Sequence, residues 1–130
     1  MTLPRRTAVL AAVTLGALPV LAACSSSADE GSPIGVQAAK DQCLVKPQVV
    51  KPGPVNVQVN WSGEGPGEVY VYGEENGSFT KVVGEIEDLT DGLTKTFTVD
   101  LAEGKYEVSC KLVSATDGIR VPIEAANRAS

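Results

Sequence analysis

Histidine is missing from this sequence of 130 residues, and Met1 is its only methionine. The absence of histidine excludes Ser-His-Asp and Cys-His catalysis, and it excludes zinc sites that are built on imidazole ligands. No other set of residues supplies a nucleophile, a base and an oxyanion donor together, so we expect that the protein is not an enzyme. If Met1 is lost with a cleaved leader, the mature chain also has no thioether ligand for copper.

The N-terminal segment is organised like a secretory signal peptide. Arg5 and Arg6 form a positively charged start, residues 7–20 form a mainly apolar run, and Leu21-Ala22-Ala23-Cys24 follows. These last four residues resemble the lipobox of bacterial lipoproteins, in which the cysteine sulfur is lipidated and the chain is cut just before it. The alternative is a transmembrane helix, but the apolar run is short for a membrane span.

Cleavage before Cys24 would leave a lipid-anchored protein on the extracytoplasmic face of the cell membrane. The arginine pair leaves the export route open between general secretion and the twin-arginine pathway. Residues 24–33 show no apolar periodicity and predict a flexible tether. We therefore expect a signal peptide over 1–23, a tether over 24–33, one domain over 34–126 and a C-terminal tail over 127–130.

The mature chain is strongly acidic. The sequence has 11 basic and 16 acidic residues, and the loss of Arg5 and Arg6 leaves 9 basic against 16 acidic. A nucleic-acid-binding domain needs a basic footprint, so we expect no nucleic-acid partner. The same charge argues against tight electrostatic adhesion to anionic lipid and suits either a cationic ligand or plain solubility.

The sequence after the tether has the pattern of short β-strands. Apolar and polar residues alternate with a period of two, which is typical of a half-buried strand. The alternating or β-rich runs are Val55–Trp61, Val69–Tyr72, Thr94–Leu101, Lys105–Leu112 and Ile119–Ala125. Turn residues such as Asn76-Gly77 and Asp117-Gly118 separate them. This spacing predicts an all-β fold, either a β-sandwich or a Greek-key barrel.

Two cysteines remain once Cys24 carries lipid. An even pair in an exported domain indicates a disulfide, so Cys43 and Cys110 are the candidate partners. Such a bond would stabilise the fold by about 4 kcal/mol in the chain-entropy model. The alternative is that both cysteines are thiolate ligands of a metal ion, because the thiolate is the form that binds metals.

The segment from Gly104 to Cys110 resembles the penultimate strand of cupredoxins, where a Gly-x-Tyr-x-x-x-Cys sequence delivers the copper thiolate. A blue-copper site also needs a histidine a few residues later and usually a methionine beyond it. Residues 111–116 supply neither of these ligands. The resemblance therefore implies the cupredoxin architecture without type 1 electron transfer.

A longer stretch, from about Val36 to Ile123, resembles the cupredoxin-like domain of EfeO-type iron-uptake lipoproteins. The order and spacing of short pieces carry this resemblance: Asp41-Gln42-Cys43, Gly67–Tyr72, Val82–Leu89, Gly92–Thr96, Gly104–Lys111 and Asp117–Pro122. It implies a cupredoxin-like Greek-key β-sandwich that binds copper or ferric iron for the components of an iron-uptake system. The helical, metal-binding peptidase-like domain of the larger family members has no counterpart in this sequence.

The resemblance also implies where a metal would bind. Cys43, Glu68 and Cys110 occupy the positions that a site without histidine would use. Cupredoxin topology brings the ends of the opening and penultimate strands to one pole, so we expect Cys43 and Cys110 to be neighbours there, with Glu68 close by. The function would then be that of a lipid-anchored metal-binding accessory domain.

Each of these candidates has a plainer interpretation. Glu68 can be an ordinary charge at the entrance of a strand. Glu85, Glu87, Asp88 and Asp91 could together hold a hard cation, or they could form a solvated turn. The alternative function is therefore a disulfide-stapled adhesion or scaffolding module that holds no metal.

Overall fold

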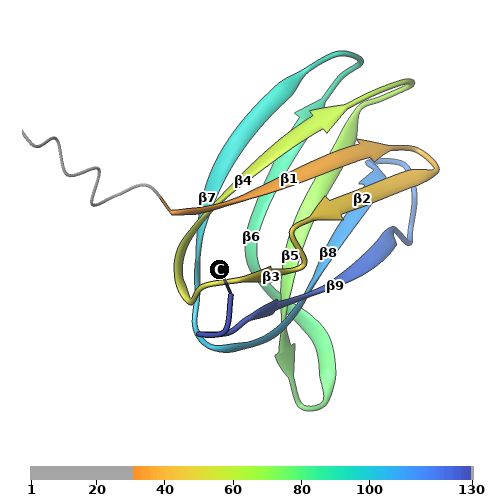
Figure 1. Cartoon of the computed structure of the whole chain (residues 1–130). Helices are drawn as coiled ribbons and strands as arrows, with labels where there is room; N and C mark the ends of the chain where they lie inside the picture. Colours follow the sequence, from red (N-terminus) through yellow and green to blue (C-terminus); the bar gives the residue numbers. More distant parts are fainter. Residues whose placement is uncertain (1–30, 130) are drawn as a thin grey trace, which may run out of the picture.

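The computed structural model describes residues 31–129, which form two packed β-sheets (Figure 1). The nine strands are β1 (Ser32–Ala39), β2 (Gln42–Lys46), β3 (Val49–Val50), β4 (Gly53–Trp61), β5 (Gly67–Glu75), β6 (Ser78–Leu89), β7 (Thr94–Leu101), β8 (Gly104–Leu112) and β9 (Ile119–Ala125). One sheet has the order β2-β1-β4-β7 and the other β3-β9-β8-β5-β6. The predicted all-β sandwich is confirmed.

The strand β1 begins two residues before the predicted start of the domain. Ser32 and Pro33, which we placed in the tether, pair with Val55 and Asn56 of β4 and belong to the sheet. The signal peptide, Cys24 and the rest of the tether lie outside the described residues. Within residues 31–129, no helix is long and apolar enough to cross a bilayer.

The apolar residues of the period-two pattern form the core between the sheets. In β4, Val55, Val57, Val59 and Trp61 point inward and are at most 1% exposed, and the intervening residues face outward. Trp61 is fully buried, and its indole nitrogen donates a hydrogen bond to the carbonyl oxygen of Glu64 at 3.2 Å. The buried valines of β5 and β8 pack against this row from the other sheet.

The two ends of the sandwich differ in what they carry. At one end β1 begins, β9 ends and the C-terminal segment lies close to the start of the domain (Figure 1). We call this end the N-terminal pole. The other end, the distal pole, carries the turn between β1 and β2 and the loops that follow β4, β6 and β8. Any tether that precedes β1 therefore enters at the end opposite these loops.

Candidate functional site

A disulfide between Cys43 and Cys110 joins the two sheets near the distal pole. Cys43 lies on β2 and Cys110 on β8, with 5.6 Å between their Cα atoms and a sequence separation of 67. Cys110 is completely buried and Cys43 is 7% exposed. The predicted proximity of the two cysteines and the disulfide alternative are confirmed.

Glu68 lies beside the disulfide in the sheet but on the opposite face. In the ladder between β5 and β8, Val69 pairs with Cys110 and Glu68 pairs with Lys111. Neighbouring residues of a strand point to opposite faces. The side chain of Cys110 therefore points into the core, whereas that of Glu68 points to the outer surface of the sheet.

The metal site that we predicted from Cys43, Glu68 and Cys110 is not assembled in this structure. The two sulfurs are consumed by the disulfide, which removes the thiolate form that binds metals. The carboxylate of Glu68 is directed away from them by the alternation of the strand. Within residues 31–129, no three side chains of histidine, cysteine, aspartate or glutamate are grouped to hold a metal ion.

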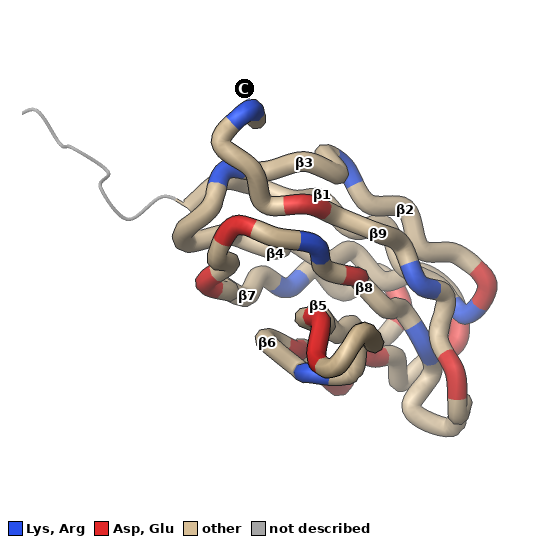
Figure 2. The backbone as a smooth tube through the Cα atoms, turned by 90° about the horizontal axis from the view of Figure 1, so that it is seen from below, with Lys and Arg blue, Asp and Glu red and all other residues tan. Residues whose placement is uncertain are grey.

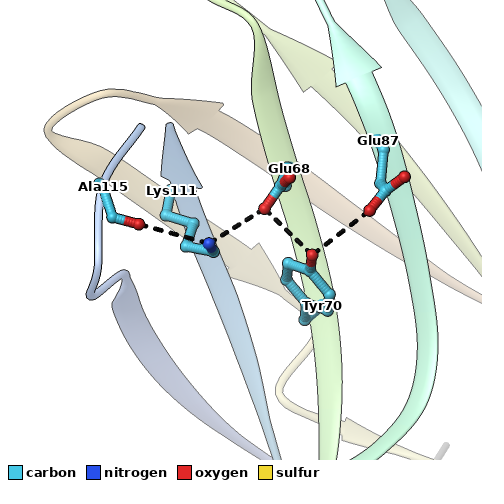
Figure 3. A network of polar contacts seen from close by, with 5 residues as sticks. All are labelled: Glu68, Tyr70, Glu87, Lys111 and Ala115. Atoms are coloured by element: carbon cyan, nitrogen blue, oxygen red, sulfur yellow. Dashed lines mark hydrogen bonds and ion pairs between the residues drawn. The ribbon is translucent and has the colours of Figure 1, made fainter. Parts of the chain in front are cut away.

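Glu68 is instead the centre of a polar network on the outer face (Figure 3). Its Oε2 atom lies 3.1 Å from Nζ of Lys111 and accepts a hydrogen bond from the Tyr70 hydroxyl at 3.0 Å. The same hydroxyl lies 3.5 Å from Oε1 of Glu87, and Lys111 also donates to the carbonyl oxygen of Ala115 at 3.4 Å. Glu68 is only 7% exposed, and these partners provide the compensation that a buried charge needs.

The network keeps the Tyr70 hydroxyl protonated. Desolvation by burial, followed by the hydrogen bond to Glu68 and the negative charges of Glu68, Glu87 and Glu85, raises the pKa of Tyr70 well above its ordinary value. A phenolate at this position would face three carboxylates, so Tyr70 acts as a hydrogen-bond donor rather than as a base. Tyr70 was not among the site residues predicted from the sequence, which places it only in a β-rich run.

Next to this network, two tyrosines and two cations form a row across β5. The rings of Tyr70 and Tyr72 are stacked with their centroids 5.6 Å apart. The Arg120 guanidinium lies 4.4 Å from the Tyr72 centroid, and Nζ of Lys111 lies 5.6 Å from that of Tyr70. Arg120 also donates to the carbonyl oxygen of Phe79 and to Glu107. The ring faces are thus engaged with each other and with cations, which does not suit a platform for stacking a flat ligand.

Comparisons with known proteins support the fold. No family model and no curated protein matches this sequence. The chain is similar in structure to Na-dithionite-reduced auracyanin from the photosynthetic bacterium Roseiflexus castenholzii, with a TM-score of 0.56 and 12% sequence identity. This similarity covers 74% of this chain and 98% of auracyanin. Because auracyanin is a cupredoxin, the similarity places this domain in the cupredoxin-like class of β-sandwiches.

The residues of this chain do not fit the blue-copper site of cupredoxins. The sequence has no histidine, and its one methionine is Met1. Cys110, which the sequence resemblance places at the copper thiolate position, is bonded to Cys43. A type 1 site needs imidazole and thiolate ligands, and the described domain offers neither in this oxidation state.

Proposed function

We propose that this chain is a lipid-anchored, extracytoplasmic accessory protein whose cupredoxin-like domain is a disulfide-stapled binding and scaffolding module. The observation that carries the proposal is the bond between Cys43 and Cys110, which uses the two sulfurs of the domain to join its sheets. Structural disulfides persist in oxidising compartments outside the cytoplasm. The bond is therefore consistent with the export that the N-terminal segment predicts.

The position of the tether supports a role close to a membrane surface. Gly31 is seven positions after the predicted lipid site at Cys24, and a fully extended chain over seven positions reaches roughly 25 Å. This tether would enter at the N-terminal pole, where β1 begins. A domain held in this way has its N-terminal pole towards the membrane and its distal loops free for a partner.

A thiol and metal assay on the soluble domain, expressed without Cys24, tests the staple. The protein is purified without reductant, its free thiols are counted under denaturing conditions, and its metal content is measured. We expect no free thiols and no stoichiometric metal. Two free thiols together with one bound metal ion per domain would overturn the proposal in favour of a thiolate site.

Metal handling for an iron-uptake system, as the EfeO-type resemblance implies, is the second candidate function. The observation that favours it is the 5.6 Å separation of the Cys43 and Cys110 Cα atoms, because reduction would leave two thiols side by side. A thiolate pair suits Cu(I), whereas the carboxylates of the outer face are the harder ligands that ferric iron prefers.

Metal binding by the same soluble domain, measured before and after reduction of its disulfide, distinguishes the two functions. One Cu(I) bound per reduced domain and none per oxidised domain would support metal handling that is controlled by the disulfide. No binding in either state, with ferric iron tested in parallel, would leave the scaffolding function alone.

A further inference from the structure

The two cysteines of the disulfide are shielded unequally. Cys110 is completely buried on β8, which has β5 and β9 as its neighbours in the sheet. Cys43 is 7% exposed and lies on β2, an edge strand of the other sheet. The free side of an edge strand is not covered by a further strand. A reagent that comes from solvent therefore meets Cys43 before Cys110.

A groove of about 300 Å³ opens beside Cys43, between β2 and β9. These two strands belong to different sheets and lie side by side (Figures 1 and 2), so no β-ladder joins them. Within the described part of the chain, β3 pairs with β9 only at Glu124 and Ala125, which leaves the earlier residues of β9 uncovered on that side. The groove is lined by Cys43, Leu44, Val45, Lys46, Gln48 and Val121.

The lining suits a small anionic molecule with an apolar body. Lys46 is its only charged residue; it is exposed, and none of the ion pairs within residues 31–129 involves it. Leu44, Val45 and Val121 supply apolar surface. An ammonium group attracts anions and favours the thiolate form of a nearby thiol. The volume of the groove lies at the lower end of the range for small-molecule sites.

We propose that this groove is the entry site for an anionic thiol of low molecular weight, which exchanges with the disulfide at Cys43. The inference rests on the disulfide of the proposed function, and it names the sulfur and the kind of reagent through which that disulfide can be opened. The unequal burial of the two cysteines carries it, together with the groove and its single positive charge.

The exchange is a nucleophilic substitution at sulfur. The incoming thiolate attacks Sγ of Cys43 and forms a new S–S bond, while the bond between Cys43 and Cys110 breaks. The electron pair of the broken bond stays on Cys110, which takes up the proton that the incoming thiol released to solvent. A second thiolate then attacks the sulfur of the bound reagent, and Cys43 leaves and is protonated in the same way. The products are two cysteine thiols and one disulfide of the reagent.

The site of attack is tested by mapping the first product that the oxidised soluble domain forms with mercaptoethanesulfonate. The reaction is stopped with acid, which protonates the thiolates and halts exchange, and free cysteines are blocked with N-ethylmaleimide after unfolding. Mass spectrometry of the peptides then locates both groups. We expect the reagent on Cys43 and the maleimide on Cys110, with at least about tenfold less of the reverse product.

Single-cysteine variants of the soluble domain measure the same preference in a second way. Cys110→Ala leaves only the thiol of Cys43, and Cys43→Ala leaves only the thiol of Cys110. In the folded state, we expect Cys110→Ala to react with the uncharged reagent hydroxyethyl disulfide at least about tenfold faster than Cys43→Ala. After unfolding in urea, the two rates should agree within about twofold, because neither thiol is then shielded.

The role of Lys46 is tested through the charge of the reagent. Lys46→Gln removes the charge of the groove, and Lys51→Gln removes the same charge from an exposed position between β3 and β4 as a control. We expect Lys46→Gln to slow reduction by mercaptoethanesulfonate about twofold or more and to leave reduction by neutral mercaptoethanol within about 1.5-fold. Lys51→Gln should leave both rates within about 1.5-fold.

Three outcomes would overturn the entry site. They are the reagent found on Cys110 as often as on Cys43, equal rates of the two single-cysteine variants in the folded state, or equal effects of Lys46→Gln and Lys51→Gln on the anionic reagent. The first two show that the disulfide is not reached through the groove, and the third shows that Lys46 does not attract the reagent. All three leave the untreated domain without free thiols, so the disulfide of the proposed function is judged separately by the thiol count.

Discussion

Glu68 shows at the scale of single residues how a buried carboxylate is kept in a sheet. Its two partners, Lys111 and the hydroxyl of Tyr70, come from the neighbouring strand and from its own strand. Glu68→Gln keeps the volume of the side chain but removes the charge that both partners face. We expect it to lower the free energy of unfolding by about 1–2 kcal/mol, measured by urea denaturation.

The exposed pair between Glu124 and Arg128 provides the matched control for Glu68→Gln. Glu124→Gln removes a carboxylate from a solvent-accessible pair, which contributes little. Its free energy of unfolding should stay within about 0.5 kcal/mol of the unmodified domain. If the two substitutions lowered the free energy of unfolding equally, the network around Glu68 would stabilise the domain no more than an exposed ion pair does.

The hydroxyl of Tyr70 gives the domain a dependence on alkaline pH. Desolvation, the hydrogen bond to Glu68 and the nearby carboxylates raise the pKa of Tyr70 in the folded state above its ordinary value of 10.0. The unfolded chain therefore loses this proton first, so the contribution is complete below about pH 10 and is lost as the pH rises further. We expect the melting temperature to fall as the pH rises from about 10 to about 12. The fall should be smaller in Tyr70→Phe, and identical profiles would contradict this role.

At the scale of elements, the strands with a regular alternation could be predicted from the sequence, and the irregular strand β6 could not. The alternation in β4, β7, β8 and β9 is regular because one face of each is buried in the core. We did not predict β6 as a strand. It is an edge strand with mostly exposed residues, and bulges interrupt its pairing with β5. A strand without one buried face has no regular period to detect.

The candidate site could also be predicted only in part from the sequence. The closeness of Cys43 and Cys110 could be expected from the topology of the fold class, and the structure confirms it. The face on which Glu68 lies depends on the register between β5 and β8, and a shift of one residue reverses it. Composition and spacing do not fix that register, so the sequence could place Glu68 at the pole of the two cysteines but could not assign it to the opposite face of the sheet.

The disulfide links elements that no β-ladder joins, because β2 and β8 belong to different sheets. Removal of the bond with Cys43→Ala/Cys110→Ala should lower the free energy of unfolding by about 2–5 kcal/mol, measured by chemical denaturation. The unmodified domain should show the same loss after reduction. The double variant leaves no free thiol that could react. If the double variant were as stable as the unmodified domain, the disulfide would not stabilise the fold as we propose.

At the scale of the whole molecule, the fold separates the start of β1 from the loops of the distal pole. The N-terminal pole receives the chain that precedes β1, and the loops that follow β4, β6 and β8 lie at the distal pole. If the protein is lipid-anchored as we propose, net negative charge on the distal loops would keep them in solvent above an anionic membrane. A short tether at the N-terminal pole would then leave the distal pole accessible to a partner.

This arrangement depends on lipid attachment at Cys24, which lies outside the described residues. If the lipobox resemblance is correct, Cys24→Ser removes the sulfur that accepts the lipid, and the precursor should remain uncleaved or the protein should leave the membrane fraction. Ser25→Ala changes the adjacent residue but keeps the sulfur, so it should be processed and anchored as before. Membrane fractionation, combined with incorporation of labelled palmitate, distinguishes the two variants. A Cys24→Ser protein that is cleaved normally and stays in the membrane without label would show that something other than this lipid holds the domain there.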